Sequence, residues 1–453
     1  MNIRSKATSL ALLGLLSLGA GSCSKFLEPL PQNSLSPTQV FSDEAGATAS
    51  LLGTYGAMTS SSYLAVTYPV FSDMSADNLA WTGTFPTWSQ VKNHSMLADN
   101  ADNQNMWAAL YAVINSANNV IKFTPTIGTI SEARKTQLMA EAQFVRAAAY
   151  FDLVRYWGDV PLVLTPTVGP GPDLNVARSP KAQVYDQIKV DLTAAEAVLP
   201  DVNVGRGTKW AAKAIKARLA LYRGLWQEAA DLADQIVASG KFQLLPTYRA
   251  VFTTEFSAES IWEIAFEATG NKSFEAFYML PGTNGGRNEA SPTGTGSTLP
   301  TAYEVGDTRK AATISDGTFT SSGTGTVPAG VQIKYYQPNG EDNVRYIRYA
   351  EVLLIGAEAK ANLSNATGAL ALLNRVRTRA GLTPSVATGT ALLDAIAQER
   401  RVELALEGHR WFDLIRTGKA QQLLGISDPN KLLFPIPQRE IQNNPNINQN
   451  PGY

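Results

Sequence analysis

The chain has 453 residues, of which 44 % are hydrophobic and 17 % charged, so it is long enough and apolar enough to bury a large core. Its formal net charge is −1, which argues against the basic excess that a nucleic-acid-binding protein needs to displace counterions from phosphates. We therefore expect no nucleic-acid partner.

The N-terminal segment has the layout of a signal peptide. Arg4 and Lys6 make its start positive, an apolar stretch covers residues 10–18, and small residues follow. The apolar stretch is too short to cross a bilayer, which needs about 20 residues. We therefore expect residues 1–22 to be a removed export signal and the mature chain to cover residues 23–453.

Cys23 is the only cysteine, and it directly follows the small residues Ala20-Gly21-Ser22. A single cysteine cannot form an internal disulfide, although an exported chain meets an oxidising environment. The position is similar to a bacterial lipobox, whose cysteine is lipidated. Each buried CH₂ of an acyl chain adds about 0.8 kcal/mol of membrane affinity, so several chains give a permanent anchor. We predict lipidation of Cys23; the alternative is an incidental cysteine in an ordinary signal peptide.

Apolar residues recur at helical spacing along much of the mature chain. One stripe holds Trp107, Leu110, Ile114 and Ile121, which places Trp107 in the core. Further stripes contain Phe144, Ala148 and Phe151; Ile215, Leu219 and Tyr222; Trp226, Ala229, Ala233 and Val237; and Val352, Ile355, Ala359 and Leu363. Two alanine-rich stretches, residues 210–240 and 350–381, are typical of helical hairpins, and the first is similar to a tetratricopeptide unit of about 34 residues.

Two long segments have a different composition. Residues 60–100 hold Trp81, Phe85 and Trp88 among Thr, Ser, Asp and Asn, and residues 281–330 are rich in Gly, Thr, Ser and Pro. We expect no helices in either segment. Segments of this kind, carried on a rigid scaffold, are where binding residues usually lie.

Three glutamates near the C-terminus, Glu399, Glu403 and Glu407, fall four residues apart and therefore on one face of a helix. Leu392 and Ile396 share that face, so the carboxylates point toward packed structure. A buried carboxylate is costly unless it is paired.

The sequence offers arginine partners for these carboxylates. They are Arg400 and Arg410 nearby and Arg375, Arg377 and Arg379 on the preceding helix. The alternative is a metal or acid/base site that uses His409. Fixed arginine charges would lower the pKa of the carboxyls and compete with a cation, so we favour a structural ion-pair network.

We expect neither a metal site nor a cofactor. No His/Cys ligand set surrounds His94 or His409 in the sequence, which disfavours zinc. The segment at residues 97–105 carries Asp99, Asp102 and several Asn residues, which could bind Ca²⁺, but it lacks the central Gly and the terminal Glu of a calcium loop. Helix capping is the favoured interpretation.

A series of motifs, in order, resembles the SusD/RagB family of Bacteroidetes outer-membrane lipoproteins. They are SCSKFLEPLPQ, MWAALYAVINSANNVI, AEAQFVRAAAYFDLVRYWGDVPLV, ARSPKAQVYDQIKVDLTAAEAVLP, YEVGDTRK, RYIRYAEVLLIGAEA, LNRVRTRAGL, ERRVELALEGHRWFDLIRTG and the terminal FPIPQREIQNNPNINQNPGY. One motif by itself would be weak, whereas this many in order is highly specific.

The resemblance implies a mainly α fold with four tetratricopeptide-like helix pairs and irregular ligand-binding insertions, here near residues 60–100 and 270–345. Family members are surface lipoproteins that lie over a SusC-like TonB-dependent transporter, capture glycans or in some cases peptides, and are not enzymes. The implied function is therefore capture of an oligo- or polysaccharide and its delivery to the transporter. A peptide-binding member, a protein-binding scaffold and a glycan-degrading enzyme with two carboxylates flanking a cleft are the alternatives.

Candidate ligand-binding residues come from the aromatic segment. Trp81, Trp88 and Phe85 lie outside any helical stripe, and Asp77 and Asn78 accompany them. A sugar ring has an apolar face and a hydroxyl rim, so an aromatic platform beside polar side chains suits it. The alternative is that the tryptophans anchor the loop, in which case we expect the site around residues 278–287.

Overall fold

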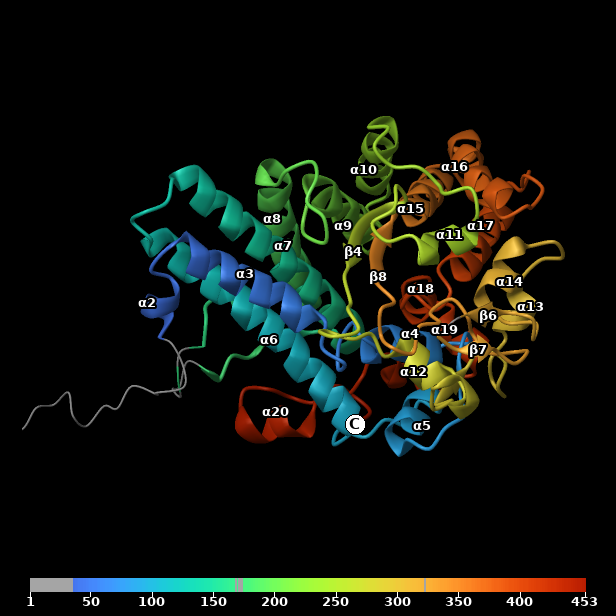
Figure 1. The fold of residues 1–453 in the computed structure, drawn as a ribbon, viewed down its shortest axis with the longest axis horizontal. Helices are drawn as coiled ribbons and strands as arrows, with labels where there is room; N and C mark the ends of the chain where they lie inside the picture. The colour runs from blue at the N-terminus through green and yellow to red at the C-terminus, as the bar shows by residue number, and fades with distance from the viewer. Residues whose placement is uncertain (1–35, 168, 170–173, 322) are drawn as a thin grey trace, which may run out of the picture.

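The predicted helical stripes are helices in the structure, a computed structural model that describes residues 36–167, 169, 174–321 and 323–453. The predicted signal peptide and Cys23 lie outside the described residues. The fold is mainly α-helical, as expected (Figure 1). Within the described residues, no helix combines the length and the apolarity that crossing a membrane requires.

Long helices form the scaffold and pack side by side from one end of the molecule to the other (Figure 1). They are α3 (Glu44–Met58), α6 (Ala101–Phe123), α7 (Glu132–Trp157), α8 (Lys181–Val198), α9 (Lys209–Tyr222), α10 (Trp226–Ala238), α15 (Tyr349–Asn362), α16 (Ala366–Arg379) and α17 (Gly389–Glu403). From α6 to α10 each helix contacts the next, and α15 then packs against α10, α16 and α17. Trp107 is buried in this core, as its stripe predicts.

Both predicted hairpins are present, as α9–α10 and α15–α16. Gly224, in the turn between α9 and α10, has a positive φ of 68°, which a residue with a side chain adopts only at a cost. Gly356 lies where α15 is held between two helices: a Cβ at this position would lie 2.8 Å from Leu372 and 3.0 Å from Ala233. Small residues therefore set the close spacing of these helices.

The insertions contain short helices, so the expectation of none in residues 60–100 and 281–330 was wrong. The short helices of the chain are α2 (Pro37–Val40), α4 (Thr67–Ser75), α5 (Pro86–Lys92), α11 (Tyr248–Thr253), α12 (Glu275–Met279), α13 (Leu299–Ala302), α14 (Thr308–Thr313), α18 (Arg410–Arg416), α19 (Ala420–Leu424) and α20 (Gln438–Asn443). Every residue of α4 is buried. Burial overrides the weak helix propensity of this sequence because tertiary packing supplies most of a short helix's stability.

The strands are short and pair in antiparallel twos. They are β1 (Ala80–Trp81) with β5 (Ala290–Ser291), β2 (Val160–Pro161) with β3 (Arg178–Ser179), β4 (Ser260–Ile264) with β8 (Val344–Arg348), and β6 (Thr320–Ser321) with β7 (Gly325–Thr326).

Asn100 caps α6 by accepting the backbone N–H of Asn103 at 3.0 Å, so the polar segment before this helix does act as a cap.

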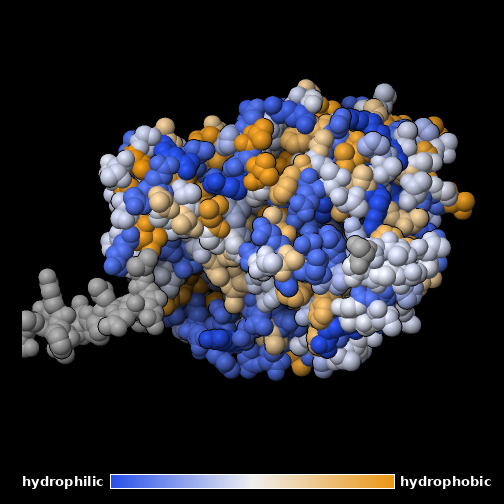
Figure 2. Space-filling model, in the orientation of Figure 1, coloured by the Kyte–Doolittle hydropathy of each residue, from blue (hydrophilic) through white to orange (hydrophobic). Residues whose placement is uncertain are grey.

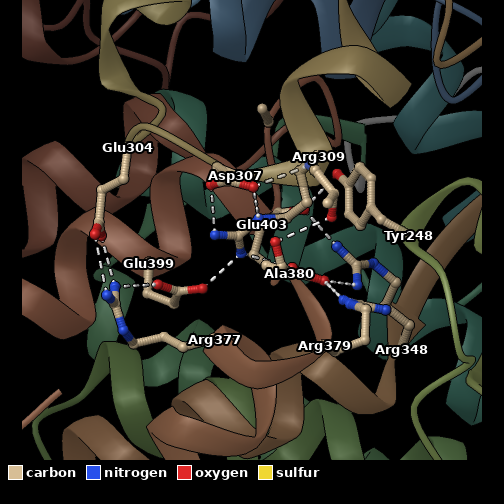
Figure 3. A network of polar contacts seen from close by, with 12 residues as sticks. Tyr248, Glu304, Asp307, Arg309, Arg348, Arg377, Arg379, Ala380, Glu399 and Glu403 are labelled. Carbon is tan, nitrogen blue, oxygen red and sulfur yellow. Dashed lines mark hydrogen bonds and ion pairs between the residues drawn. The ribbon is translucent and has the colours of Figure 1, made fainter. Parts of the chain in front are cut away.

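A buried ion-pair network surrounds Glu403, at the last turn of α17 (Figure 3). Its carboxylate accepts hydrogen bonds from Arg309 of α14 at 2.9 Å, from Arg348 of β8 at 2.5 Å, and from Arg379 of α16. Glu259, directly before β4, binds Arg348 and Arg379 as well, at 2.9 and 3.0 Å. The network therefore ties two helices and one strand, α14, α16 and β8, to one carboxylate of α17.

The neighbouring glutamates join the same network. Glu399 accepts hydrogen bonds from Arg309 at 2.6 Å and from Arg377 at 3.2 Å. Glu407 lies beyond the end of α17, yet it pairs with Arg348 and Lys334, each at 2.7 Å. All three glutamates thus point into packed structure. The helical spacing predicts this for Glu399 and Glu403, whereas the prediction that Glu407 continues the same helix was wrong, because α17 ends at Glu403.

The predicted partners are correct in part. Arg377 and Arg379 bind the glutamates, whereas Arg375 donates to the Tyr349 hydroxyl, Arg400 pairs with Asp413 and Arg410 pairs with Asp77. The partners that the sequence did not indicate are Arg309, Arg348 and Lys334.

The electrostatics around Glu403 and His409 disfavour acid/base chemistry by these two groups. Burial by itself would raise the pKa of the Glu403 carboxyl, but the charges of Arg379, Arg348 and Arg309 outweigh burial and hold the pKa well below its usual value. His409 lies 3.9 Å from Glu351, and burial lowers the pKa of its imidazole to about 3. The Glu403 carboxylate therefore stays ionised and the His409 imidazole stays neutral at physiological pH. These states suit the structural ion-pair network that we favoured from the sequence.

We predict that Glu403→Ala lowers the free energy of unfolding by about 3–5 kcal/mol, because removing one partner leaves buried charges uncompensated. Urea unfolding at pH 7 measures this change. The matched control is Glu255→Ala, at an exposed loop position, which should change the free energy by less than about 0.5 kcal/mol. Equal urea midpoints for the two variants would show that the network contributes little.

Candidate ligand-binding site

The two insertions meet at a small sheet. Strands β1 and β5 pair antiparallel, with Trp81 opposite Ala290. Next to them the carboxylate of Glu289, buried in the fold, accepts hydrogen bonds from the backbone N–H groups of Thr84 at 2.6 Å and Phe85 at 3.1 Å. Only glycine fits at position 83, because a Cβ there would lie 2.5 Å from the Cα of Glu289. The loop before α5 is thereby fixed to the segment that follows α12.

An aromatic cluster forms where α5 and α12 meet; we define it as Phe85, Trp88, Phe274, Phe277 and Tyr278. The ring centroid of Tyr278 lies 5.3 Å from that of Trp88 and 5.8 Å from that of Phe85. Phe277 stands edge-on to Tyr278 at 5.2 Å, and Phe274 lies 6.3 Å from both. These separations fall in the range in which aromatic pairs attract.

The members of the cluster differ in exposure. The side chain of Trp88 is only 3 % exposed and packs edge-on against Phe71, while the other four members are half-buried. Figure 2 shows hydrophobic residues among hydrophilic ones on the surface over α5 and α12. The cluster therefore offers aromatic faces to solvent on a base that Trp88 supports.

Arg287 adds a positive charge at the edge of the cluster. Its guanidinium lies 4.8 Å from the centre of the Phe85 ring and 3.4 Å from Glu289. With 45 % of its side chain exposed, it remains accessible to a ligand. A cation over an aromatic face at this distance is an attractive arrangement.

The structure places the sequence-predicted residues in two groups. Phe85, a member of the cluster, and Trp81, in β1, are half-buried, and the indole N–H of Trp81 is unpaired among the described residues. Trp88 is packed in the core, as the anchoring alternative proposed. Asn78 is fully buried; it donates to Asp73 at 2.6 Å and accepts from Arg401 at 3.1 Å.

Asp77 is occupied by ion pairs. It binds Arg410 at 2.7 Å and Arg401 at 3.1 Å, and it accepts a hydrogen bond from the Thr298 hydroxyl. Burial raises the pKa of this carboxyl, but the two arginines outweigh burial and lower it. Asp77 and Asn78 therefore use their polar groups to hold the segment in place.

The two locations that the sequence offered as alternatives are one location in the structure. Tyr278 and Arg287, at the ends of the second range, contact Phe85 of the first. Phe274 and Phe277 were not indicated by the sequence analysis. The spacing Phe-x-x-Phe-Tyr in a segment otherwise poor in aromatic residues is the signal that could have identified them.

Two family models match the chain. The model described as "SusD family" matches residues 324–431. The model described as "Starch-binding associating with outer membrane" matches residues 25–221. The matched regions lie on both sides of the segment that contains α12 and the second half of the aromatic cluster.

Relatives and solved structures extend the similarity over nearly the whole chain. SusD-like protein P2 of Formosa agariphila is 29 % identical over 490 residues, covering 94 % of this chain and 96 % of the relative. A SusD superfamily protein from Bacteroides vulgatus, 23 % identical, shares the fold with a TM-score of 0.82 over 91 % of this chain and 100 % of that one. A structure described as a laminarin-binding SusD-like protein is 27 % identical, with a TM-score of 0.77 over 91 % of this chain and 100 % of its own. The chain belongs to the SusD/RagB family.

Proposed function

We propose that this protein is a surface-exposed outer-membrane lipoprotein that captures an oligo- or polysaccharide and delivers it to a SusC-like TonB-dependent transporter. The observation that carries the proposal is the half-exposed aromatic cluster, which a buried carboxylate and a strand pair hold in place. Membership of a family whose model is described as starch-binding and associating with the outer membrane supports it.

The chemistry of the cluster suits a sugar ring. Tyr278, Phe85 and Phe277 offer apolar faces to the C–H side of a pyranose, and Trp81 lies beside them. Arg287 and the exposed Asn288 can bind hydroxyl groups at the rim. Ligand sites combine apolar surface with a few placed polar groups in this way.

The roles of the predicted residues are divided accordingly. We assign ligand contact to Trp81, Phe85 and Tyr278. Trp88 supports the platform from below, because it packs against both Phe85 and Tyr278 while remaining buried. Asp77 and Asn78 fix the segment through Arg401. The laminarin-binding relative supports a glycan, rather than a peptide, as the ligand.

We predict that Tyr278→Ala and Trp81→Ala each weaken glycan binding about tenfold, which corresponds to about 1.4 kcal/mol, because each removes an aromatic face. Isothermal titration with laminarihexaose and with maltohexaose measures the affinity. Trp88→Ala should instead lower thermal stability, since a buried aromatic residue truncated to alanine costs about 3–5 kcal/mol.

The control for these variants is Trp226→Ala, which removes another half-buried tryptophan, on α10. It should bind as well as the wild type. If Tyr278→Ala and Trp81→Ala keep wild-type stability and wild-type affinity, the site is elsewhere. A ligand that is shortened during the titration would instead indicate an enzyme, and binding only of peptides would favour the peptide-binding alternative.

We predict that Cys23→Ser moves the protein from the membrane to the soluble fraction, because it removes the acyl chains. Fractionation followed by immunoblotting measures this. Gentle detergent extraction of the wild type should recover a large outer-membrane β-barrel with it. A variant as firmly bound to membranes as the wild type would refute lipidation, and recovery of the lipoprotein without a barrel would count against delivery.

A further inference from the structure

Glu275, the first residue of α12, is a buried acid without a visible partner. Its side chain is 1 % exposed, and Oε2 has no hydrogen-bond partner among the described residues. A buried polar group in this condition is rare and costly, so it needs a physical explanation. Its position matters because Tyr278, in the same short helix, belongs to the aromatic cluster.

The surroundings of Glu275 are mostly acidic. Burial is the largest cause that raises the pKa of the Glu275 carboxyl. Three nearby acids raise it further: Asp342 before β8, Asp73 in α4 and Glu407 beyond α17. Lys334 opposes them, but its ammonium already donates to Glu407 at 2.7 Å and to the Tyr248 hydroxyl at 2.8 Å. Among the described residues, Glu275 thus has no cation of its own.

The two neighbouring buried acids, Asp73 and Asp342, accept more hydrogen bonds than Glu275 does. Asp73 accepts hydrogen bonds from Asn78 at 2.6 Å and from the backbone of Leu406 and Gly408. Asp342 accepts one, from the backbone of Gln337 at 2.8 Å, and its other oxygen is unpaired among the described residues. Burial raises the pKa of each of these two carboxyls to about 6. The Glu275 carboxyl accepts fewer hydrogen bonds than either of them, so its neutral, protonated form is favoured more strongly.

Backbone hydrogen bonds of the two residues directly before α12 fix this helix to the rest of the fold. The backbone N–H of Phe274 donates to the carbonyl of Ala65 at 2.8 Å, and that of Ser273 donates to Gly340 at 3.0 Å. Ala276 and Met279 are buried on one side of the helix, while Phe277 and Tyr278 are half-buried on the other. If Glu275 lost its proton, the buried negative charge would therefore favour a movement of α12, the helix that carries Tyr278 of the aromatic cluster.

We propose that Glu275 is protonated in the folded protein at neutral pH and that this proton makes it a positioning residue, holding α12 and thereby Tyr278 in the geometry for ligand binding. The positioning role of Glu275 rests on the proposed glycan site, whereas its protonation does not.

The sign of the effect follows from linkage. The ordinary pKa of a Glu carboxyl is 4.5, and in the fold it is raised. The folded state therefore holds a proton that the unfolded chain has released, so Glu275 lowers the free energy of unfolding progressively as the pH rises above about 4.5. The amide in Glu275→Gln has the same shape and cannot ionise. The variant should match the wild type at pH 5 and be more stable at pH 7 and 9.

Two measurements on the full-length protein in detergent test the proton without any ligand. The infrared difference spectrum of wild type minus Glu275→Gln, recorded at pH 7, should contain the carbonyl stretch of an un-ionised carboxylic acid. The gap in thermal unfolding temperature between the two proteins should widen from pH 5 to pH 9. Glu267→Gln, at an exposed position nearby, should show neither effect.

A third measurement tests positioning. The affinity of the wild type for laminarihexaose should fall at least threefold from pH 6 to pH 9, whereas that of Glu275→Gln should stay constant. An un-ionised carboxyl with an equal fall in affinity in both proteins would overturn the positioning role alone. Absence of binding at every pH would refute the proposed function and leave the proton result standing.

Other outcomes would show that Glu275 is not protonated in the fold. A carboxylate band at pH 7, together with a stability gap that does not change with pH, would show that Glu275 is ionised in the fold. If calcium ions raise the unfolding temperature of the wild type but not of Glu275→Gln, and the acid band is absent, the unpaired oxygens bind a cation instead.

Discussion

The carboxylate of Glu403 meets three arginines in the interior of the protein, and the arrangement of the C-terminal half depends on that meeting. Arg309, Arg348 and Arg379 come from a short helix, a strand and a long helix. Each buried charge would be costly if it were unpaired, so the network favours the arrangement of these elements that brings all of them together. Hydrophobic burial drives the helices together; the network sets their register.

The same chain segment links this network to the proposed ligand-binding region. Beyond Glu403, the backbone N–H groups of Leu406 and Gly408 bind Asp73, and Arg410 binds Asp77. The insertion that carries Trp81 and Phe85 therefore starts from a residue fixed on the scaffold. Further along the insertion, Glu289 holds the backbone of Thr84 and Phe85. Rigid support at several points is what lets a half-buried aromatic cluster keep a defined shape.

Buried acids in this fold have two different physical solutions. Around Glu403 and Glu351, arginines supply positive charge and hold the carboxyls ionised; with Arg218 at 2.6 Å, the pKa of Glu351 falls to about 2 despite complete burial. At Glu275 the part of the chain that the structure describes offers no such cation, and we infer that a proton takes its place. The first solution keeps Glu403 and Glu351 ionised at physiological pH, and the second couples the stability of one short helix to pH.

The sequence by itself determined the export signal layout, the helical hairpins and the inward direction of Glu399 and Glu403, because each follows from local composition or from the 3.6-residue period of a helix. It also carried enough ordered motifs to indicate the family. Only the tertiary structure decided which arginines bind: Arg309 lies 94 residues from Glu403 and Arg348 lies 55 residues from it, and no local pattern joins them. It likewise decided that Trp88 is buried while Phe85, three residues earlier, stays half-exposed, and it joined two distant insertions at Tyr278. Burial and pairing between segments far apart in the chain depend on how the whole scaffold packs, which is why local patterns could not predict them.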